Sequence, residues 1–290
     1  MIEKLKLNSR GKWVAGYYNK KALGENNGDE INRLLGQKLN YPVYHHFGIG
    51  VVKNIDYILK RLNPEEIKRK LYDLEKAESQ HLVRLLSGRI NQNSLIFDAG
   101  SGLGGTAFDL NEKYGCSVYG ANIAEKQVKL ANNLAVQRGI KDKVKFFLMN
   151  ITRTNFKEEK FDVAINNETT MYVSLDKLFS ELSRILKNGG IYGIVTWCRA
   201  DKYLANNHYA DKIDSHYHTK MHSLGAYKKS LSAHNFKIIQ INDLTKKALD
   251  YWILRKYLSI ATGVEQFFID GYKKRKLKYI SILAMKQSLL

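Results

Sequence analysis

The stretch LIFDAGSGLGG, residues 95–105, decides the fold. An apolar run leads into Asp98, and glycines follow at positions 100, 102, 104 and 105. Glycine allows a sharp turn and lets the backbone approach a ligand closely. The pattern therefore predicts a buried strand, a ligand-binding turn at its carboxyl end, and a helix that begins at the turn.

Downstream of this stretch, apolar runs alternate with helical patterns, which predicts an α/β fold with a largely parallel sheet and helices on both faces. Seven strands are expected, at 94–99, 117–122, 144–150, 161–166, 191–198, 236–243 and 278–285. Helices are expected at 105–114, 125–138 and 175–186, and long helices are expected before each of the last two strands. An antiparallel strand is expected within that last pair.

The chain divides into two predicted regions. Residues 1–93 show no strand pattern of comparable strength, and we expect them to form a helical cap or lid. Residues 94–290 are expected to form one Rossmann-like domain. Insertions at about 199–235 and 246–276 are expected to shape the pocket of the domain.

Composition is typical of a globular protein. Of 290 residues, 44% are apolar and 11% aromatic, enough for a full core. We find no apolar run of about 18 residues and no apolar segment of a signal peptide after the charged N-terminal start. Cys116 and Cys198 are expected to be reduced, buried thiols. These features favour a cytoplasmic protein without a membrane span.

The chain is also basic, with 47 Lys and Arg, 28 Asp and Glu, and a net charge of +19. A basic surface attracts nucleic acid, anionic membrane or a phosphorylated small molecule. The lysines are scattered, with dense clusters only at 68–70 and 273–278. Because a nucleic-acid site would need a contiguous basic stripe, no nucleic-acid partner is expected. A lysine-rich source genome would explain the charge equally well.

The glycine turn differs from a dinucleotide site, which a lone glycine turn would also fit. Its spacing is GxGxGG after an acidic strand end, whereas a pyrophosphate is typically bound by GxGxxG opening a helix. The fourth strand ends in NNE, 166–168, and LKNGG, 186–190, precedes the fifth. On these residues the chain resembles class I S-adenosylmethionine-dependent methyltransferases. The resemblance implies that Asp98, Gly100 and Gly102 line the pocket for the methionine and sulfonium parts of that cofactor.

The stretch VYGANIAEKQ, 118–127, follows the next strand. It is similar to the cyclopropane-synthase-like branch of the class, in which GxxxSxxQ follows this strand; here Ala124 replaces the serine. The resemblance implies that Asn122 and Gln127 bind the ribose, that Asn150 and Ile151 flank the adenine, and that Asn166 completes the cofactor site. A turn-capping role for Asn122 is the alternative.

A closer resemblance covers nearly the whole chain, to the geranyl diphosphate C-methyltransferases and relatives acting on other prenyl diphosphates. The matching segments are YYN at 17–19, YHHFGIG at 44–50, LEKAE at 74–78, NNETTMYVSLDKLFSELSRILKNGG at 166–190 and TGVEQFFIDGYK at 262–273, with looser matches at 216–223 and 251–255. In LEKAE, Glu78 replaces a glutamine of the family pattern. The resemblance implies C-methylation of a prenyl diphosphate in terpenoid biosynthesis.

Methylation of an alkene leaves a carbocation, which requires a π-rich or anionic wall and a base. Glu168 follows the fourth strand at the ligand-binding edge, and the resemblance assigns it as the base. A structural carboxylate is the alternative reading. Tyr172, Tyr217 and Trp252 are candidates for the aromatic wall, although aromatic residues also fill cores.

The diphosphate requires a site of its own, for which Mg²⁺ with oxygen ligands is the expected clamp. Asn19 and Glu75 are the candidate metal contacts, with a metal-bound water as one way for Glu75 to hold the ion. The candidate substrate-binding residues are Asn19, Tyr44, His45, His46, His216, His222 and Trp252. A zinc site built from the histidines is a competing idea, but their spacing matches no recognised zinc pattern.

Two departures affect the acceptor pocket. Ile253 stands where the geranyl enzymes suggest a glutamate, and SLGAY, 223–227, lacks expected arginines. Geranyl and farnesyl diphosphate are therefore both open, as is cyclisation after methylation. A prenyl chain attached to another natural product is an alternative acceptor, and a nucleic-acid-binding methyltransferase-like protein is another. Related enzymes associate, so a homo-oligomer is possible.

Overall fold

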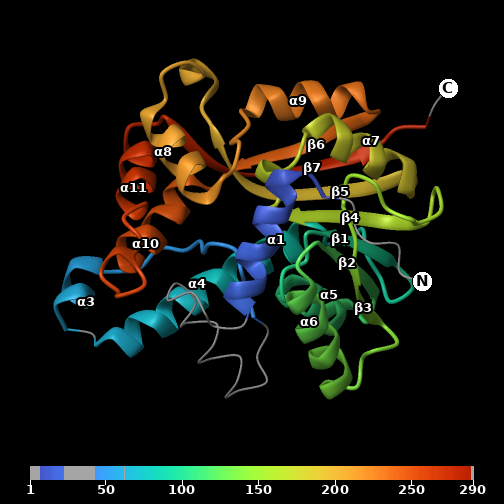
Figure 1. The fold of residues 1–290 in the computed structure, drawn as a ribbon, viewed down its shortest axis with the longest axis horizontal. Helices are drawn as coiled ribbons and strands as arrows, with labels where there is room; N and C mark the ends of the chain where they lie inside the picture. The colour runs from blue at the N-terminus through green and yellow to red at the C-terminus, as the bar shows by residue number, and fades with distance from the viewer. Residues whose placement is uncertain (1–6, 23–42, 62, 289–290) are drawn as a thin grey trace.

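A computed structural model describes residues 7–22, 43–61 and 63–288 of the protein. Its centre is a seven-stranded sheet in the order β3-β2-β1-β4-β5-β7-β6 (Figure 1). The strands are β1 (Leu95–Ala99), β2 (Ser117–Asn122), β3 (Val144–Leu148), β4 (Phe161–Asn167), β5 (Leu186–Arg199), β6 (Phe236–Asp243) and β7 (Leu277–Lys286). β1 to β5 are parallel, and β7 runs antiparallel to both β5 and β6. The predicted α/β fold is confirmed.

Helices cover both faces of the sheet, as its continuous apolar strands require. On one face, α4 (Pro64–Leu85), α5 (Gly105–Tyr114) and α6 (Glu125–Gln137) contribute Leu82, Phe108 and Ala131 to the core. On the other face, α7 (Leu175–Ile185) and α9 (Leu224–Ala233) contribute Leu182 and Leu231. The carboxyl ends of β1, β2 and β4 are thereby left at one edge, where a ligand can reach them.

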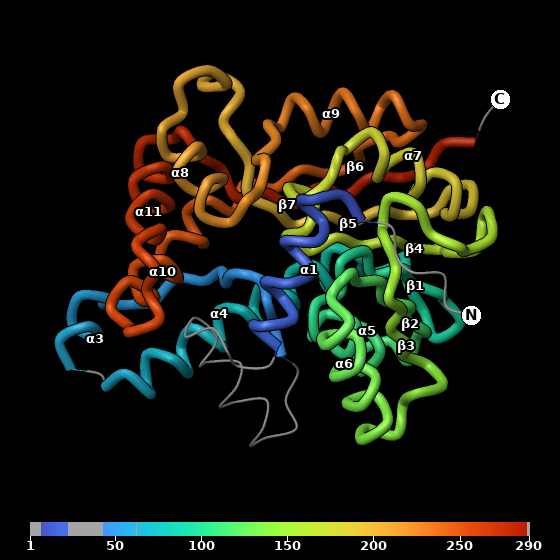
Figure 2. The backbone as a smooth tube through the Cα atoms, in the orientation of Figure 1, coloured from blue at the N-terminus to red at the C-terminus, as the bar shows by residue number. Residues whose placement is uncertain are grey.

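Two further groups of helices border this edge. α8 (His208–Tyr217), α10 (Thr245–Lys256) and α11 (Glu265–Lys273) pack together beside the sheet (Figure 2). The N-terminal region contributes α1 (Ser9–Ala22), α3 (Ile55–Arg61) and α4. α1 contacts α6, and the Arg10 guanidinium donates to the His218 carbonyl at 2.8 and 2.7 Å. α1 therefore lies across the edge where the strands end.

The start of α4 is strongly specified by its sequence. The Asn63 side chain accepts a hydrogen bond from the Glu66 N–H, the Glu66 carboxylate accepts one from the Asn63 N–H, and Pro64 stands at the first turn. This capping box fixes where the helix begins. The apolar side chains of α4, among them Leu71, Leu74 and Leu82, pack in the core, and Glu75 and Glu78 are buried with them.

β5 differs from its predicted range. The sequence predicted a strand from residue 191, after LKNGG, but the structure extends β5 back to Leu186. Leu186 pairs with Phe161 and Ile191 pairs with Val163, so the intervening residues bulge between two paired positions. Gly189 lies in this bulge at φ +75°, a backbone conformation for which glycine is suited.

Among the described residues, every helix is too short or too polar to cross a membrane.

Candidate active site

The glycine turn between β1 and α5 forms the floor of the site. Asp98 is buried at the end of β1, and the Gly100 and Ser101 N–H groups donate to the Ala121 carbonyl of β2 at 2.9 and 3.1 Å. Gly100 has φ +98°, and a Cβ there would lie 2.3 Å from the Thr169 Oγ1. Only glycine fits this position, because the turn packs directly against the segment that follows β4.

A cavity of about 840 Å³ opens above this turn, large enough for a nucleoside cofactor. Of the predicted cofactor residues, those that line it are Asp98, Gly100, Gly102, Asn122, Gln127, Asn150 and Ile151. Asn166 does not line it: its amide donates to the Ala99 carbonyl and its oxygen accepts from the Tyr192 hydroxyl at 2.5 Å. Asn166 is buried between β1, β4 and β5, so its side chain stabilises the sheet.

The two predicted ribose residues form one chain of hydrogen bonds. Asn122 donates to Gln127 at 2.7 Å, and the Gln127 amide nitrogen lies 2.6 Å from the His45 Nδ1. The Asn122 oxygen also accepts from the Ala124 N–H at 3.0 Å. Asn122 thus combines the turn-capping role, considered above as an alternative, with a position on the cavity wall.

A second, smaller cavity of about 50 Å³ adjoins the first. Its wall is mostly aromatic, with Tyr18, Phe47, Tyr172, Trp197, Tyr217 and Tyr251. It also contains two cationic and two acidic side chains, Lys21, Arg255, Glu75 and Glu168. The two cavities share six lining residues: Tyr18, Tyr44, His45, His46, Glu168 and Tyr172.

Glu168 lies where the two cavities meet, and its backbone conformation is unusual. Its φ is +49°, in the left-handed region that a non-glycine residue seldom adopts. The Phe47 N–H donates to Oε2 at 2.9 Å, the Tyr279 hydroxyl donates to Oε1 at 2.5 Å, and the side chain is 7% exposed. Burial, followed by the negative charge of Glu78, raises the pKa of the Glu168 carboxyl to about 8. A carboxyl with such a pKa is suited to accept a proton near neutral pH.

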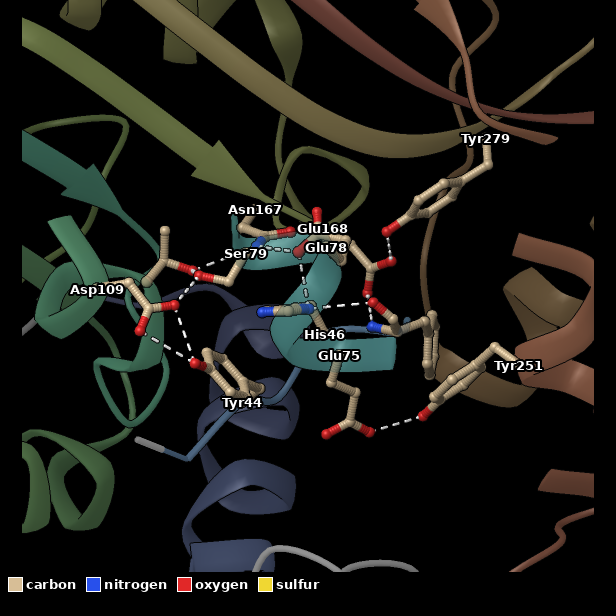
Figure 3. Close-up of polar contacts among 12 residues, drawn as sticks. Tyr44, His46, Glu75, Glu78, Ser79, Asp109, Asn167, Glu168, Tyr251 and Tyr279 are labelled. Atoms are coloured by element: carbon tan, nitrogen blue, oxygen red, sulfur yellow. Dashed lines mark hydrogen bonds and ion pairs between the residues drawn. The ribbon is translucent and has the colours of Figure 1, made fainter. Parts of the chain in front are cut away.

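A buried polar network adjoins Glu168 (Figure 3). The His46 Nδ1 lies 2.9 Å from the Glu78 Oε2, and the Asn167 amide donates to the same oxygen at 2.7 Å. Burial alone would lower the pKa of His46, but the Glu78 carboxylate raises it to about 9. Burial also raises the pKa of Asp98 to about 7, and the charge of His46 opposes this rise.

Sequence reasoning missed three residues of this network: Asn167, Tyr279 and Glu78. Tyr279 is one of many aromatic residues in apolar strands, and its sequence position gives no sign that it reaches Glu168. Glu78 did stand out, as an acidic residue in place of the family glutamine in LEKAE. That replacement was a signal, since a buried carboxylate requires a charged or hydrogen-bonding partner.

The other predicted acceptor residues lie in different places. Tyr44 lines both cavities and donates to the Asp109 Oδ2 at 2.9 Å. His222 lines the large cavity, with Nε2 3.1 Å from the Val173 carbonyl. His216 is exposed on α8 and lines neither cavity. Trp252 lies behind the aromatic wall: it stacks on Phe268 with 3.8 Å between ring centroids and lines neither cavity.

The predicted metal contacts also separate. Glu75 lines the small cavity and accepts from the Tyr251 hydroxyl at 2.9 Å. Asn19 lines neither cavity, and its side-chain oxygen accepts from the Lys126 N–H at 2.9 Å. Within the described ranges, no group of three or more His, Cys, Asp or Glu side chains is arranged to hold a metal ion. The histidines therefore offer no ready zinc site in this part of the chain.

Comparison with known proteins agrees with this geometry. A family model described as a methyltransferase domain matches residues 97–194. Geranyl diphosphate 2-C-methyltransferase of Saccharopolyspora erythraea is 34% identical over 275 residues, covering 93% of this chain and 93% of that protein. The enzyme of the same name from Streptomyces coelicolor is 32% identical, covering 93% and 91%.

Solved structures give the same relationship. A geranyl diphosphate methyltransferase in complex with GPP and sinefungin has a TM-score of 0.88 at 30% identity, covering 96% of this chain and 99% of that one. Geranyl diphosphate C-methyltransferase of Streptomyces coelicolor A3(2), in complex with Mg²⁺, geranyl diphosphate and S-adenosyl-L-homocysteine, has a TM-score of 0.86 at 29% identity, covering 96% and 98%.

The sheet order and the cavity above the glycine turn thus define an S-adenosylmethionine-dependent methyltransferase of class I. Within this class, the likeness extends over nearly the full length of both chains rather than over the cofactor domain alone. The chain belongs to the geranyl diphosphate C-methyltransferase family.

Proposed function

We propose that this enzyme methylates an alkene carbon of a prenyl diphosphate, geranyl or farnesyl in length, for terpenoid biosynthesis. The observation that carries the proposal is the position of Glu168, a buried carboxylate with a raised pKa between the cofactor-sized cavity and an aromatic one. The full-length likeness to geranyl diphosphate 2-C-methyltransferases supports the choice of substrate class.

The bound cofactor supplies the methyl group: its S–CH₃ bond breaks as the C–C bond forms, which leaves a positive charge on the neighbouring carbon of the prenyl chain. Tyr172 and Tyr217 line the aromatic cavity, and their π-faces can stabilise that charge. Glu168 Oε1 or Oε2 then accepts a proton from a carbon next to the cation, giving a new alkene. Attack on the cationic carbon by another double bond of the prenyl chain would form a ring instead.

The charged side chains of the small cavity favour a diphosphate over a neutral prenyl chain. Lys21 and Arg255 lie among its lining residues, so an anionic group can be bound beside the aromatic wall. Arg255 also pairs with Glu265, at 3.2 Å from Nε to Oε1, which holds the guanidinium in place. These cations suit the anionic end of the acceptor, and the rings suit its hydrocarbon chain.

The substrate is tested by supplying labelled S-adenosylmethionine with isopentenyl, geranyl, farnesyl and geranylgeranyl diphosphates. We expect label to enter one of the two intermediate chain lengths, and mass spectrometry of the product identifies the methylated carbon and any ring. A prenylated indole serves as the acceptor without a diphosphate. Transfer to that indole, with none to any diphosphate, would reject the proposed substrate class.

EDTA is expected to reduce methyl transfer to background, and added Mg²⁺ is expected to restore it. The diphosphate itself would provide most of the metal ligands, with Glu75 holding a metal-bound water, and the metal would neutralise the phosphate charge. Asn19 does not fit this role, because its oxygen is bonded to Lys126 away from both cavities. Initial rates after EDTA, and after return of Mg²⁺ or Zn²⁺, provide the measurement. Full activity in EDTA, or restoration by Zn²⁺ alone, would contradict the magnesium clamp.

A further inference from the structure

We propose that His46 and Glu78 form a buried charge pair that positions Glu168 and sets the pH at which Glu168 accepts a proton. The inference rests on the proposed function, since it gives Glu168 the role of base. Both residues act through Glu168, so they are positioning residues.

The first support is the way the pair is connected to Glu168 through the backbone. One Glu78 oxygen, Oε2, contacts both the His46 Nδ1 at 2.9 Å and the Asn167 amide at 2.7 Å. His46 directly precedes Phe47, whose N–H donates to Glu168, and Asn167 directly precedes Glu168 itself. A single carboxylate therefore holds both chain segments that meet at the base (Figure 3).

The second support is the strain at Glu168. A glutamate at φ +49° persists only where the surrounding contacts fix it. Its own N–H donates to the Val195 carbonyl at 2.9 Å, while its carboxylate accepts from Phe47 and Tyr279. Loosening the segment that carries Phe47 would remove one of these contacts and let the carboxylate move from its place between the cavities.

The third support is the distribution of charge around Glu168. The titratable groups coupled to it are Glu78 on α4, His46 on the 43–50 segment, Tyr172 after β4, Tyr251 on α10, Tyr272 on α11 and Tyr279 on β7. Burial raises the pKa of all four tyrosines, so they are neutral at physiological pH. Of these coupled groups, Glu78 and His46 carry the charges, and they act on the Glu168 carboxyl in opposite directions: Glu78 raises its pKa and His46 lowers it. Lys21, Arg255 and Glu75 also line the small cavity with Glu168.

Two buried atoms without hydrogen-bond partners indicate that this charge pair does more than stabilise the fold. His46 is 7% exposed and Glu78 is fully buried, yet the His46 Nε2 and the Glu78 Oε1 have no hydrogen-bond partner among the described residues. A buried pair that leaves polar atoms unsatisfied adds little to stability. His46 also lines both cavities. The arrangement suits a group that must keep its charge next to the reacting atoms.

His46→Gln is expected to move the pH midpoint of kcat upward by about one unit, because it removes the positive charge and leaves Glu78 beside the base. Turnover rises with pH through the pKa of Glu168, because the base acts when deprotonated. A higher pKa of Glu168 therefore shifts this rise to higher pH. In a Glu78→Gln background the same change is expected to move the midpoint much less, since without Glu78 the ring loses the carboxylate that keeps it charged. Asp73→Asn removes one negative charge, as Glu78→Gln does, but at an exposed position on the same helix; it is the control and is expected to leave the midpoint in place.

The charge on His46 can be measured without any substrate. Histidine NMR titration of the intact protein, with the His46 signal identified by its loss in His46→Gln, is expected to show a ring protonated up to about pH 9 and a lower pKa in Glu78→Gln. A His46 pKa near 6.5 in both proteins would overturn the inference, as would equal shifts of the kcat midpoint in the two backgrounds. A high His46 pKa in a protein that methylates no prenyl diphosphate would instead reject the proposed function.

Discussion

Glu168→Gln is expected to lower turnover by about 10²- to 10⁴-fold, the usual contribution of a general base. The amide cannot accept a proton from the substrate, and it brings no negative charge to the developing cation. It has nearly the size of the carboxylate, so its oxygen can still accept from the Phe47 N–H, and its amide group can donate to the Tyr279 oxygen. The variant should therefore fold and bind S-adenosylmethionine as the wild type does. Single-turnover rates and cofactor titration measure the two properties separately.

Glu168→Asp provides the matched control for this experiment. It keeps the carboxylate but withdraws it by one methylene from Phe47 and Tyr279, so turnover between those of the wild type and Glu168→Gln is expected. Turnover of Glu168→Gln within tenfold of the wild type would show that Glu168 is a structural carboxylate, the alternative that its sequence position left open. Equal losses in both variants, together with weak cofactor binding, would indicate damage to the cavity instead.

The positions of the strands along the chain could be predicted because each strand carries its own local signal. β2 and β6 begin and end at the predicted residues, and α5 spans its predicted range, since apolar runs bounded by turn residues determine these elements. The predicted start of β5 was wrong because the true start depends on a pairing with a distant residue. Leu186 joins the sheet by pairing with Phe161, a residue 25 positions earlier, across a bulge that no local pattern reveals.

The candidate site shows the same difference between residues set by a local pattern and residues set by non-local packing. Asp98, Gly100 and Gly102 belong to one contiguous turn, and the family resemblance carried by that turn implied their place on the cavity wall, where the structure has them. Asn166 was also predicted to line the cofactor site, but its side chain points into the sheet. Side chains alternate along β4, so the neighbouring Asn167 faces the cavity instead. A one-residue difference in a strand thus reverses the direction of a side chain.

The acceptor region was the hardest to predict, because its walls come from segments far apart in the sequence. Trp252 and Phe47 are both aromatic, but only the packing of α10 against α11 decides that Phe47 faces the cavity and Trp252 stacks behind it on Phe268. Tyr279 reaches Glu168 from 111 residues away. A single sequence records no such pairing, so the residues that tune the base emerge only from the three-dimensional structure.

Gly100→Ala is expected to weaken S-adenosylmethionine binding by about 10- to 100-fold and to lower turnover as well. An alanine Cβ would lie 2.3 Å from the Thr169 Oγ1, and φ is already +98°. Overpacking of this kind costs about 1–3 kcal/mol, which corresponds to that loss in affinity if the bound state requires the native turn. Thr169 cannot move aside freely, because Thr170 beside it is buried and bonded to the Tyr227 hydroxyl at 2.6 Å. Isothermal titration with the cofactor measures the effect.

Gly139→Ala separates the effect of steric overlap from the effect of backbone strain. Gly139 also has positive φ, +69°, but nothing lies within 4 Å of its would-be Cβ. It should lower stability by about 1–2 kcal/mol, through backbone strain alone, and leave cofactor affinity unchanged. If Gly100→Ala behaved in the same way, the close approach of the turn to Thr169 would not matter for the cofactor. If only Gly100→Ala loses both affinity and turnover, the reason is geometric: Thr169 directly follows Glu168, so a displaced turn moves the cofactor site and the base together.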